Sequence, residues 1–155
     1  MKILIRSRKD IEEMARKTFL EHTALISITD FDWSFGALVH KPELLLQIAF
    51  DDVDSDVIAD ELGRKPTEEE RQKLEAKYKM FSDDQAKQVA SFYQAHKDAI
   101  DVLICHCEHG QSRSAGVATA IMEYRSRKGI TVFASDRYYP NKVYSGKLSQ
   151  HEKIS

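Results

Sequence analysis

The chain has 155 residues, of which 42% are hydrophobic and 31% charged, a size and composition typical of one soluble globular domain. Its 23 basic and 25 acidic residues give a formal net charge of −2, so its surface as a whole does not suit a nucleic-acid backbone. No apolar run approaches the roughly 18 residues that a membrane-spanning helix needs. We therefore expect a single domain over residues 1–155, with neither a nucleic acid nor a membrane as its partner.

The start of the chain and its cysteines favour a cytoplasmic protein. The first ten residues contain only three consecutive apolar side chains, which is too short for the hydrophobic region of a signal peptide. The two cysteines, Cys105 and Cys107, lie two positions apart and do not form the framework of a disulfide-rich secreted domain. Both observations indicate a reducing compartment.

Three hydrophobic stretches in the first third of the chain predict strands. The first is residues 2–6, and Ser7 after it suits the N-cap of a helix whose apolar side chains recur at helical spacing as far as Phe19. Residues 23–28 and 44–50 are compact aliphatic runs of the kind found in buried strands.

The middle of the chain is dense in charge and predicts helices. We interpret residues 57–80 as a solvated helical insertion, in which Thr67 and Glu70 have the spacing of a capping box. Ser82 and Gln85 repeat this spacing, and they predict a second helix with an apolar inner face.

A further strand and helix complete the pattern. Residues 100–105 are typical of a strand buried in a parallel sheet. A helix is expected to begin around Arg113, with Gly129 at the position just past its end. The alternation of strands and helices predicts an α/β fold with a central, mostly parallel sheet flanked by helices.

The loop at residues 107–113 joins this last strand to the helix and predicts an anion site. In open α/β sheets, ligands bind beyond the carboxyl ends of the strands. A helix N-terminus at that edge offers free N–H groups and a partial positive charge. Gly110 allows the backbone to bend so that successive N–H groups converge on one point.

Three side chains around this loop have a chemical role if the anion is a phosphate ester. Cys107, held against a helix N-terminus and near Arg113, is expected to be a thiolate at neutral pH and to attack phosphorus. The planar guanidinium of Arg113 can hold two phosphate oxygens at once. Ser114 can hydrogen-bond to the sulfur when phosphate leaves. Because the loop supplies the charge compensation, we expect neither a metal nor another cofactor.

Residues 106–114 read His-Cys-Glu-His-Gly-Gln-Ser-Arg-Ser and resemble the signature H-C-x-x-G-x-x-R-S of the cysteine-dependent protein tyrosine phosphatases, with every fixed position matched. The short chain looks most similar to the compact, dual-specificity-like branch, and within it to small bacterial or phage phosphatases. The resemblance implies a phosphatase-type phosphate loop, a cysteinyl-phosphate intermediate and a phosphorylated protein or peptide as substrate. Phosphotyrosine is the favoured substrate class, because a deep loop suits a long aryl ester.

The resemblance also implies roles for the other residues of the signature. His106 orients the loop and tunes Cys107, which is the nucleophile. The phosphate is bound, and the rim of the pocket is shaped, by the positions that follow: Glu108, His109, Gly110, Gln111, Ser112 and Arg113.

The leaving oxygen of the ester must be protonated, and a carboxylic acid on a neighbouring loop usually does this. Compact phosphatases place an aspartate just past the strand that corresponds here to the run ending at Phe50. On this resemblance, Asp52 is our first choice for the general acid, Asp51 the second and Asp54 the third.

A loop at residues 29–36 carries three aromatic side chains, Phe31, Trp33 and Phe35. We expect them to cover an edge of the core, because large aromatic side chains are mostly buried. The alternative is that Trp33 or Phe35 lines the wall on which a phosphotyrosine ring stacks.

Other interpretations of the loop remain open. A module that binds phosphate without turnover is one, and another thiolate chemistry on the same loop, such as arsenate reduction or sulfur transfer, is a second.

A zinc site is a further interpretation of this segment. Its four candidate ligands lie within five residues, which does not suit the separated ligand pairs of a zinc site: Cys105, His106, Cys107 and His109. We interpret Cys105 as a core residue, with an oxidised disulfide to Cys107 as the alternative. The sequence does not determine the oligomeric state.

Overall fold

The computed structural model describes residues 1–35, 37–52, 62–77, 79 and 81–126. In chain order its elements are β1 (Lys2–Ser7), α1 (Arg8–Met14), β2 (Thr23–Thr29), β3 (Leu44–Ala49), α3 (Glu68–Lys77), α4 (Asp83–His96), β4 (Val102–Cys107) and α5 (Arg113–Ser126). The predictions for Asp54, Gly129 and residues 57–61, 78 and 80 of the expected insertion fall outside the described residues.

The four described strands form one sheet in the order β1-β4-β2-β3, and each neighbouring pair is parallel. This confirms the predicted α/β class. Because the strands run the same way, their carboxyl ends meet at one edge of the sheet. There the register places Ser7 opposite Cys107 and Ser27 opposite His106.

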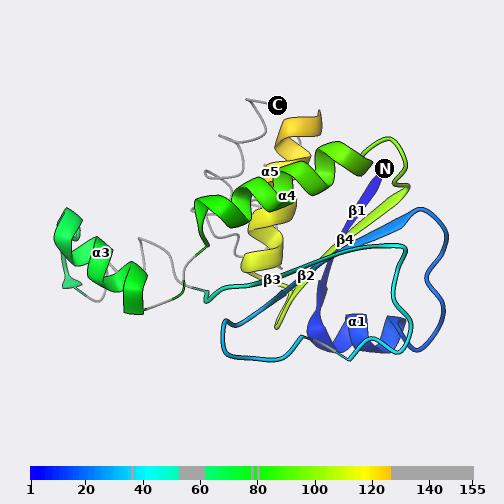
Figure 1. Cartoon of the computed structure of the whole chain (residues 1–155). Helices are drawn as coiled ribbons and strands as arrows, with labels where there is room; N and C mark the ends of the chain where they lie inside the picture. Colours follow the sequence, from blue (N-terminus) through cyan, green and yellow to red (C-terminus); the bar gives the residue numbers. More distant parts are fainter. Residues whose placement is uncertain (36, 53–61, 78, 80, 127–155) are drawn as a thin grey trace.

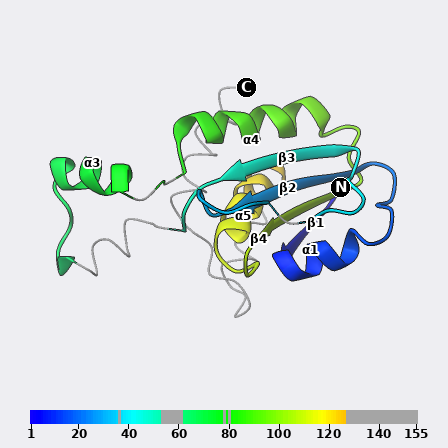
Figure 2. The ribbon, with the colours of Figure 1, turned by 60° about the horizontal axis from the view of Figure 1, so that its bottom comes forward.

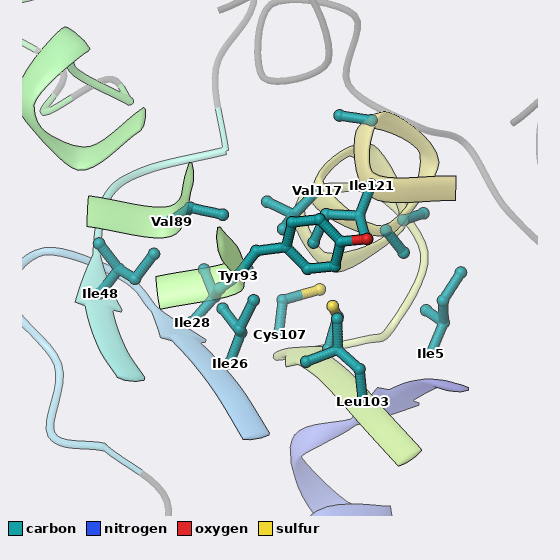
Figure 3. Close-up of a cluster of buried hydrophobic side chains, with 14 of the residues drawn as sticks. Ile5, Ile26, Ile28, Ile48, Val89, Tyr93, Leu103, Cys107, Val117 and Ile121 are labelled. Atoms are coloured by element: carbon teal, nitrogen blue, oxygen red, sulfur yellow. The ribbon is translucent and has the colours of Figure 1, made fainter. Parts of the chain in front are cut away.

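Helices cover both faces of the sheet: α4 and α5 lie on one face and α1 on the other (Figures 1 and 2). The larger core lies under α4 and α5, where Tyr93, Val117 and Ile121 meet side chains of the strands (Figure 3). Successive side chains of a strand point to opposite faces. Cys105 and Cys107 of β4 therefore point into this larger core, whereas Ile104 belongs to the smaller cluster beneath α1.

The predicted helix starts are confirmed by their capping bonds. The Ser7 hydroxyl accepts from the Asp10 N–H at 3.1 Å, and the Ser82 hydroxyl accepts from the Gln85 N–H at 3.1 Å. Helix α1 ends at Met14, earlier than the apolar spacing predicted. The carbonyl of Ala15 accepts a hydrogen bond from the N–H of His40 at 3.0 Å. A further helical turn would need this carbonyl as an acceptor, and the loop before β3 occupies it instead.

The charged segment that we interpreted as an insertion contains a helix, as predicted. Thr67 and Glu70 form the expected capping box at the start of α3, with a hydrogen bond of 3.2 Å from the Glu70 N–H to the Thr67 hydroxyl and one of 3.3 Å from the Thr67 N–H to the Glu70 carboxylate. Figures 1 and 2 both show α3 projecting away from the layers around the sheet. Among the described residues, no helix is both long enough and apolar enough to cross a bilayer.

Candidate active site

The loop that carries the sequence motif, residues 107–113 and here called the signature loop, leaves the end of β4 and leads directly into α5. Gly110 lies at its turn with φ +70°, a backbone conformation that favours glycine. A Cβ atom at this position would lie 2.7 Å from the carbonyl carbon of Arg6 and 2.8 Å from the nitrogen of Ser7. The loop is also held by the N–H of Arg8, which donates to the carbonyl of Glu108 at 3.1 Å. The signature loop therefore packs against the end of β1 and the residue that follows it.

Cys107 and Ser114 face each other at the base of this loop. The Cys107 Sγ lies 3.1 Å from the Ser114 Oγ, and the two residues are 3% and 0% exposed. A thiolate can only accept a hydrogen bond, so in that state the Ser114 hydroxyl is the donor. The pair predicted from the sequence as nucleophile and thiolate stabiliser is thus brought into contact.

Arg113 is buried at the start of α5, with 4% of its surface exposed. Its Nη1 donates to the Asp30 carboxylate at 2.6 Å and to the Phe50 carbonyl at 2.9 Å. Its Nε is buried and has no hydrogen-bond partner among the described residues. A buried guanidinium with an unused donor is a ready contact for an anionic ligand.

His106 is neutral and held from two sides. Its Nε2 lies 2.6 Å from the Ser27 Oγ, and its Nδ1 lies 3.4 Å from the Cys107 carbonyl oxygen. Because a carbonyl oxygen only accepts, these contacts place the proton on Nδ1 and make the Ser27 hydroxyl the donor to Nε2. Burial lowers the pKa of His106 to about 4. The imidazole therefore supports the backbone of Cys107 without adding a charge.

The two aspartates after β3 differ in what they bind. The Asp52 carboxylate is exposed and accepts from the Ser112 hydroxyl at 2.8 Å, so it lies beside the signature loop. The Asp51 carboxylate accepts from two backbone groups, the N–H of Phe31 at 3.3 Å and the N–H of Lys79 at 3.0 Å. Asp51 therefore ties neighbouring segments together, while Asp52 presents its carboxyl group at the loop.

The remaining loop positions form its outer side. His109 and Gln111 are exposed, and Glu108 and Ser112 are half-buried. Glu108 also forms an ion pair with Arg8 at 3.7 Å. A cavity of about 490 Å³ lies on this side, between the loop and the start of α1, lined by Ser7, Arg8, Lys9, Glu12, Glu108 and His109.

Two interpretations of individual residues are resolved here. The core assignment of Phe31 and Trp33 is wrong, because their exposed fractions are 48% and 58%. Phe31 directly follows Asp30, which binds Arg113, so this aromatic segment borders the site instead of the core. Cys105 is fully buried, as predicted for a core residue, and burial raises the pKa of its thiol to about 12.

Two residues that contact the signature motif, Asp30 and Ser27, were not predicted from the sequence. Both come from β2 and its end, next to β4 in the sheet. Asp30 had a recognisable signal, since it is an acidic residue directly after a buried strand, at the edge where ligands of α/β sheets bind. Ser27 had a weaker one, a polar residue between two isoleucines in an aliphatic run.

No family model matches the sequence, and no curated protein matches it either. Solved structures do match. Human DUSP28 is 16% identical, with a TM-score of 0.57 over 98% of this chain and 92% of that one. Tk-PTP, in a structure described as its active form, is 11% identical, with a TM-score of 0.51 over 100% of this chain and 94% of that one.

A third match is a mouse putative dual specificity phosphatase complexed with zinc tungstate. It is 16% identical, with a TM-score of 0.52 over 98% of this chain and 82% of that one. These likenesses agree with the α/β class and the mostly parallel sheet described above. The chain has the fold of the compact dual-specificity and tyrosine phosphatases.

Proposed function

We propose that this chain hydrolyses phosphate monoesters through a cysteinyl-phosphate formed on Cys107, with phosphotyrosine in proteins as its favoured substrate. The observation that carries the proposal is the buried Arg113, whose Nε has no partner among the described residues, beside the Cys107–Ser114 pair at the start of α5. A guanidinium and the free N–H groups of a helix start together suit a phosphate dianion. Each of these residues also matches the phosphatase signature.

The reaction divides into two displacements at phosphorus. In the first, the Cys107 thiolate forms a bond to phosphorus while the bond to the ester oxygen breaks, and the Asp52 carboxyl group gives its proton to that oxygen. In the second, Asp52, now a carboxylate, takes a proton from water as the water oxygen attacks phosphorus. The thiolate leaves, and the Ser114 hydroxyl stabilises it. Arg113 and the loop amides hold the phosphate oxygens throughout.

The position of the nucleophile supports an aryl ester. Cys107 is only 3% exposed, so the phosphate must reach a sulfur at the base of the loop. Phe31 and Trp33 lie exposed in the segment that follows Asp30. Exposed rings beside a phosphate site offer a surface on which a phenyl ester can stack.

The test is turnover of an aryl phosphate without added metal, comparing the native chain with Cys107→Ser. We expect the native protein to turn over and the serine variant to be inactive while it still binds inorganic phosphate. Retained activity in Cys107→Ser would contradict the mechanism. Binding without turnover in the native protein would favour the phosphate-binding module instead.

A further inference from the structure

The end of β2 contributes a charged residue to the site. Asp30 directly follows the last residue of β2, Thr29, and its Oδ1 lies 2.6 Å from the Nη1 of Arg113. The arginine side chain is 5% exposed and the aspartate side chain 34%. A buried guanidinium needs both a counter-charge and acceptors for its donors. Asp30 supplies the counter-charge and one of these acceptors.

The bonds to Nη1 leave a particular side of the guanidinium for a ligand. Nη1 carries two hydrogens, and it donates to two acceptors, the Asp30 carboxylate and the Phe50 carbonyl. The Nε hydrogen is buried without a partner among the described residues. Nε and the neighbouring Nη2 form the edge with which an arginine holds two oxygens of a phosphate group. The contacts to Nη1 therefore fix the plane of the guanidinium without using its Nε donor.

We propose that Asp30 is a positioning residue, which acts on phosphate only through Arg113 and holds the Nε edge of that side chain ready for the ligand. This inference rests on the proposed phosphate site. It assigns a role to the end of β2, so that the ends of all four described strands take part in building the site. The arginine is thus oriented before phosphate arrives, which lowers the entropy lost on binding.

The carboxylate has a second physical effect with the opposite sign. Its negative charge lies near the place where a phosphate dianion binds, and like charges repel. If repulsion dominated, removal of the charge would tighten binding. If positioning dominates, as we propose, what matters is the acceptor at Nη1, and an uncharged side chain that still accepts a hydrogen bond will serve nearly as well.

Two substitutions at this position separate the effects. Asp30→Asn keeps an oxygen acceptor and removes the charge, whereas Asp30→Ala removes both. We expect Asp30→Ala to weaken the binding of inorganic phosphate, measured by calorimetry, on the order of 10-fold, and Asp30→Asn to remain within about 3-fold of the native protein. The ratio kcat/KM for an aryl phosphate should follow the same order. Asp32→Ala, an exposed acidic residue two positions along the same loop, is the matched control and should leave both quantities unchanged.

A double-mutant cycle tests whether the effect passes through the arginine. Lysine lacks the Nε and Nη2 donors with which the arginine holds two phosphate oxygens. In an Arg113→Lys background, adding Asp30→Ala should therefore change the affinity for phosphate by less than about 2-fold. Unfolding transitions of all variants show whether they fold, and Asp30→Ser replaces the alanine if that variant does not. Native-like or tighter phosphate binding by Asp30→Ala would overturn the inference, and so would an equal loss in both backgrounds. Failure of the proposed hydrolysis gives a different result, a native protein without turnover.

Discussion

The hydroxyl of Ser112 donates a 2.8 Å hydrogen bond to the carboxylate of Asp52, across 60 positions of the sequence. This bond joins the signature loop to the segment after β3, on which the general acid is expected. The carboxyl group is exposed at the loop, where a leaving oxygen can be reached. The next residue toward β3 is Asp51, whose carboxylate instead accepts hydrogen bonds from the backbone N–H groups of Phe31 and Lys79.

We therefore predict that Asp52→Asn lowers kcat for a phenyl phosphate by about 100- to 10,000-fold, the usual range for loss of a general acid. The loss should be much smaller for an ester with a good leaving group, because its oxygen needs no proton. Steady-state kinetics over a series of leaving groups checks this dependence.

Asp51→Asn is the matched comparison, since the same change is made one residue away. It removes a carboxylate that accepts from two backbone N–H groups, so it should lower thermal stability. Its effect on kcat should not depend on the leaving group. A leaving-group dependence that appears in Asp51→Asn and is absent from Asp52→Asn would transfer the acid role to Asp51.

A second prediction concerns the turn of the signature loop. Gly110→Ala should lower the free energy of unfolding by about 2–4 kcal/mol, since the new Cβ meets the backbone of Arg6 and the positive φ adds strain. Gly63→Ala is the control, because Gly63 has a φ of +67° with nothing within 4 Å of its Cβ position. The positive φ alone should lower the free energy of unfolding of the Gly63→Ala variant by about 1 kcal/mol. Equal losses for the two variants in denaturant unfolding would mean that the loop does not press on β1.

A third prediction follows from the neutral imidazole. Burial holds the pKa of His106 at about 4 in the folded protein, against 6.5 as its ordinary value. Below pH 6.5 the imidazole of the unfolded chain binds a proton, whereas the buried imidazole of the folded protein stays neutral. Proton binding therefore stabilises the unfolded state relative to the folded state as pH falls. This contribution to stability is complete above pH 6.5 and is lost progressively as pH falls from 6.5 toward 4.

Unfolding midpoints measured across that window check the effect. In His106→Gln the stability should fall less between pH 6.5 and 4 than in the native protein. His40→Gln changes an exposed histidine and should keep the native dependence. A native slope in the His106 variant would show that the imidazole is not the titrating group.

A fourth prediction separates the two cysteines. Cys105 is fully buried and its pKa is raised to about 12, so it stays a protonated thiol at neutral pH and should not react with iodoacetate. Cys107 should be the residue alkylated, and inorganic phosphate should protect it. Peptide mass analysis after brief labelling gives the site. Preferential labelling of Cys105 in the folded protein would contradict this assignment.

The parts of the structure that sequence could predict depend on local signals. The strands follow from the aliphatic runs at residues 23–28 and 44–50, and the helix starts follow from capping residues such as Ser7 and Ser82. The expected burial is confirmed for β2, whereas β3 lies at the edge of the sheet and is mostly half-buried. The signature loop was predictable because Cys107, Gly110 and Arg113 lie close together in the chain. Their chemistry needs only the local strand, turn and helix.

The remaining parts depend on contacts between distant segments. Asp30 meets Arg113 only because β2 pairs with β4, and the periodicity of either strand does not reveal that pairing. The exposed Phe31 and Trp33 were predicted to be buried from the general behaviour of aromatic side chains. Their exposure depends on where the loop after β2 leaves the sheet.

The most direct test of the account is to find the phosphoryl group on the sulfur. Ser114→Ala removes the hydroxyl that contacts the Cys107 sulfur and that we propose stabilises the departing thiolate, so the second displacement should slow and the covalent intermediate should accumulate. Acid quenching of this variant during turnover of an aryl phosphate, followed by peptide mass analysis, locates the group. We predict one added phosphoryl group on the peptide containing Cys107. Turnover without any adduct, or with the adduct on another residue, would contradict the assignment of Cys107 as the nucleophile.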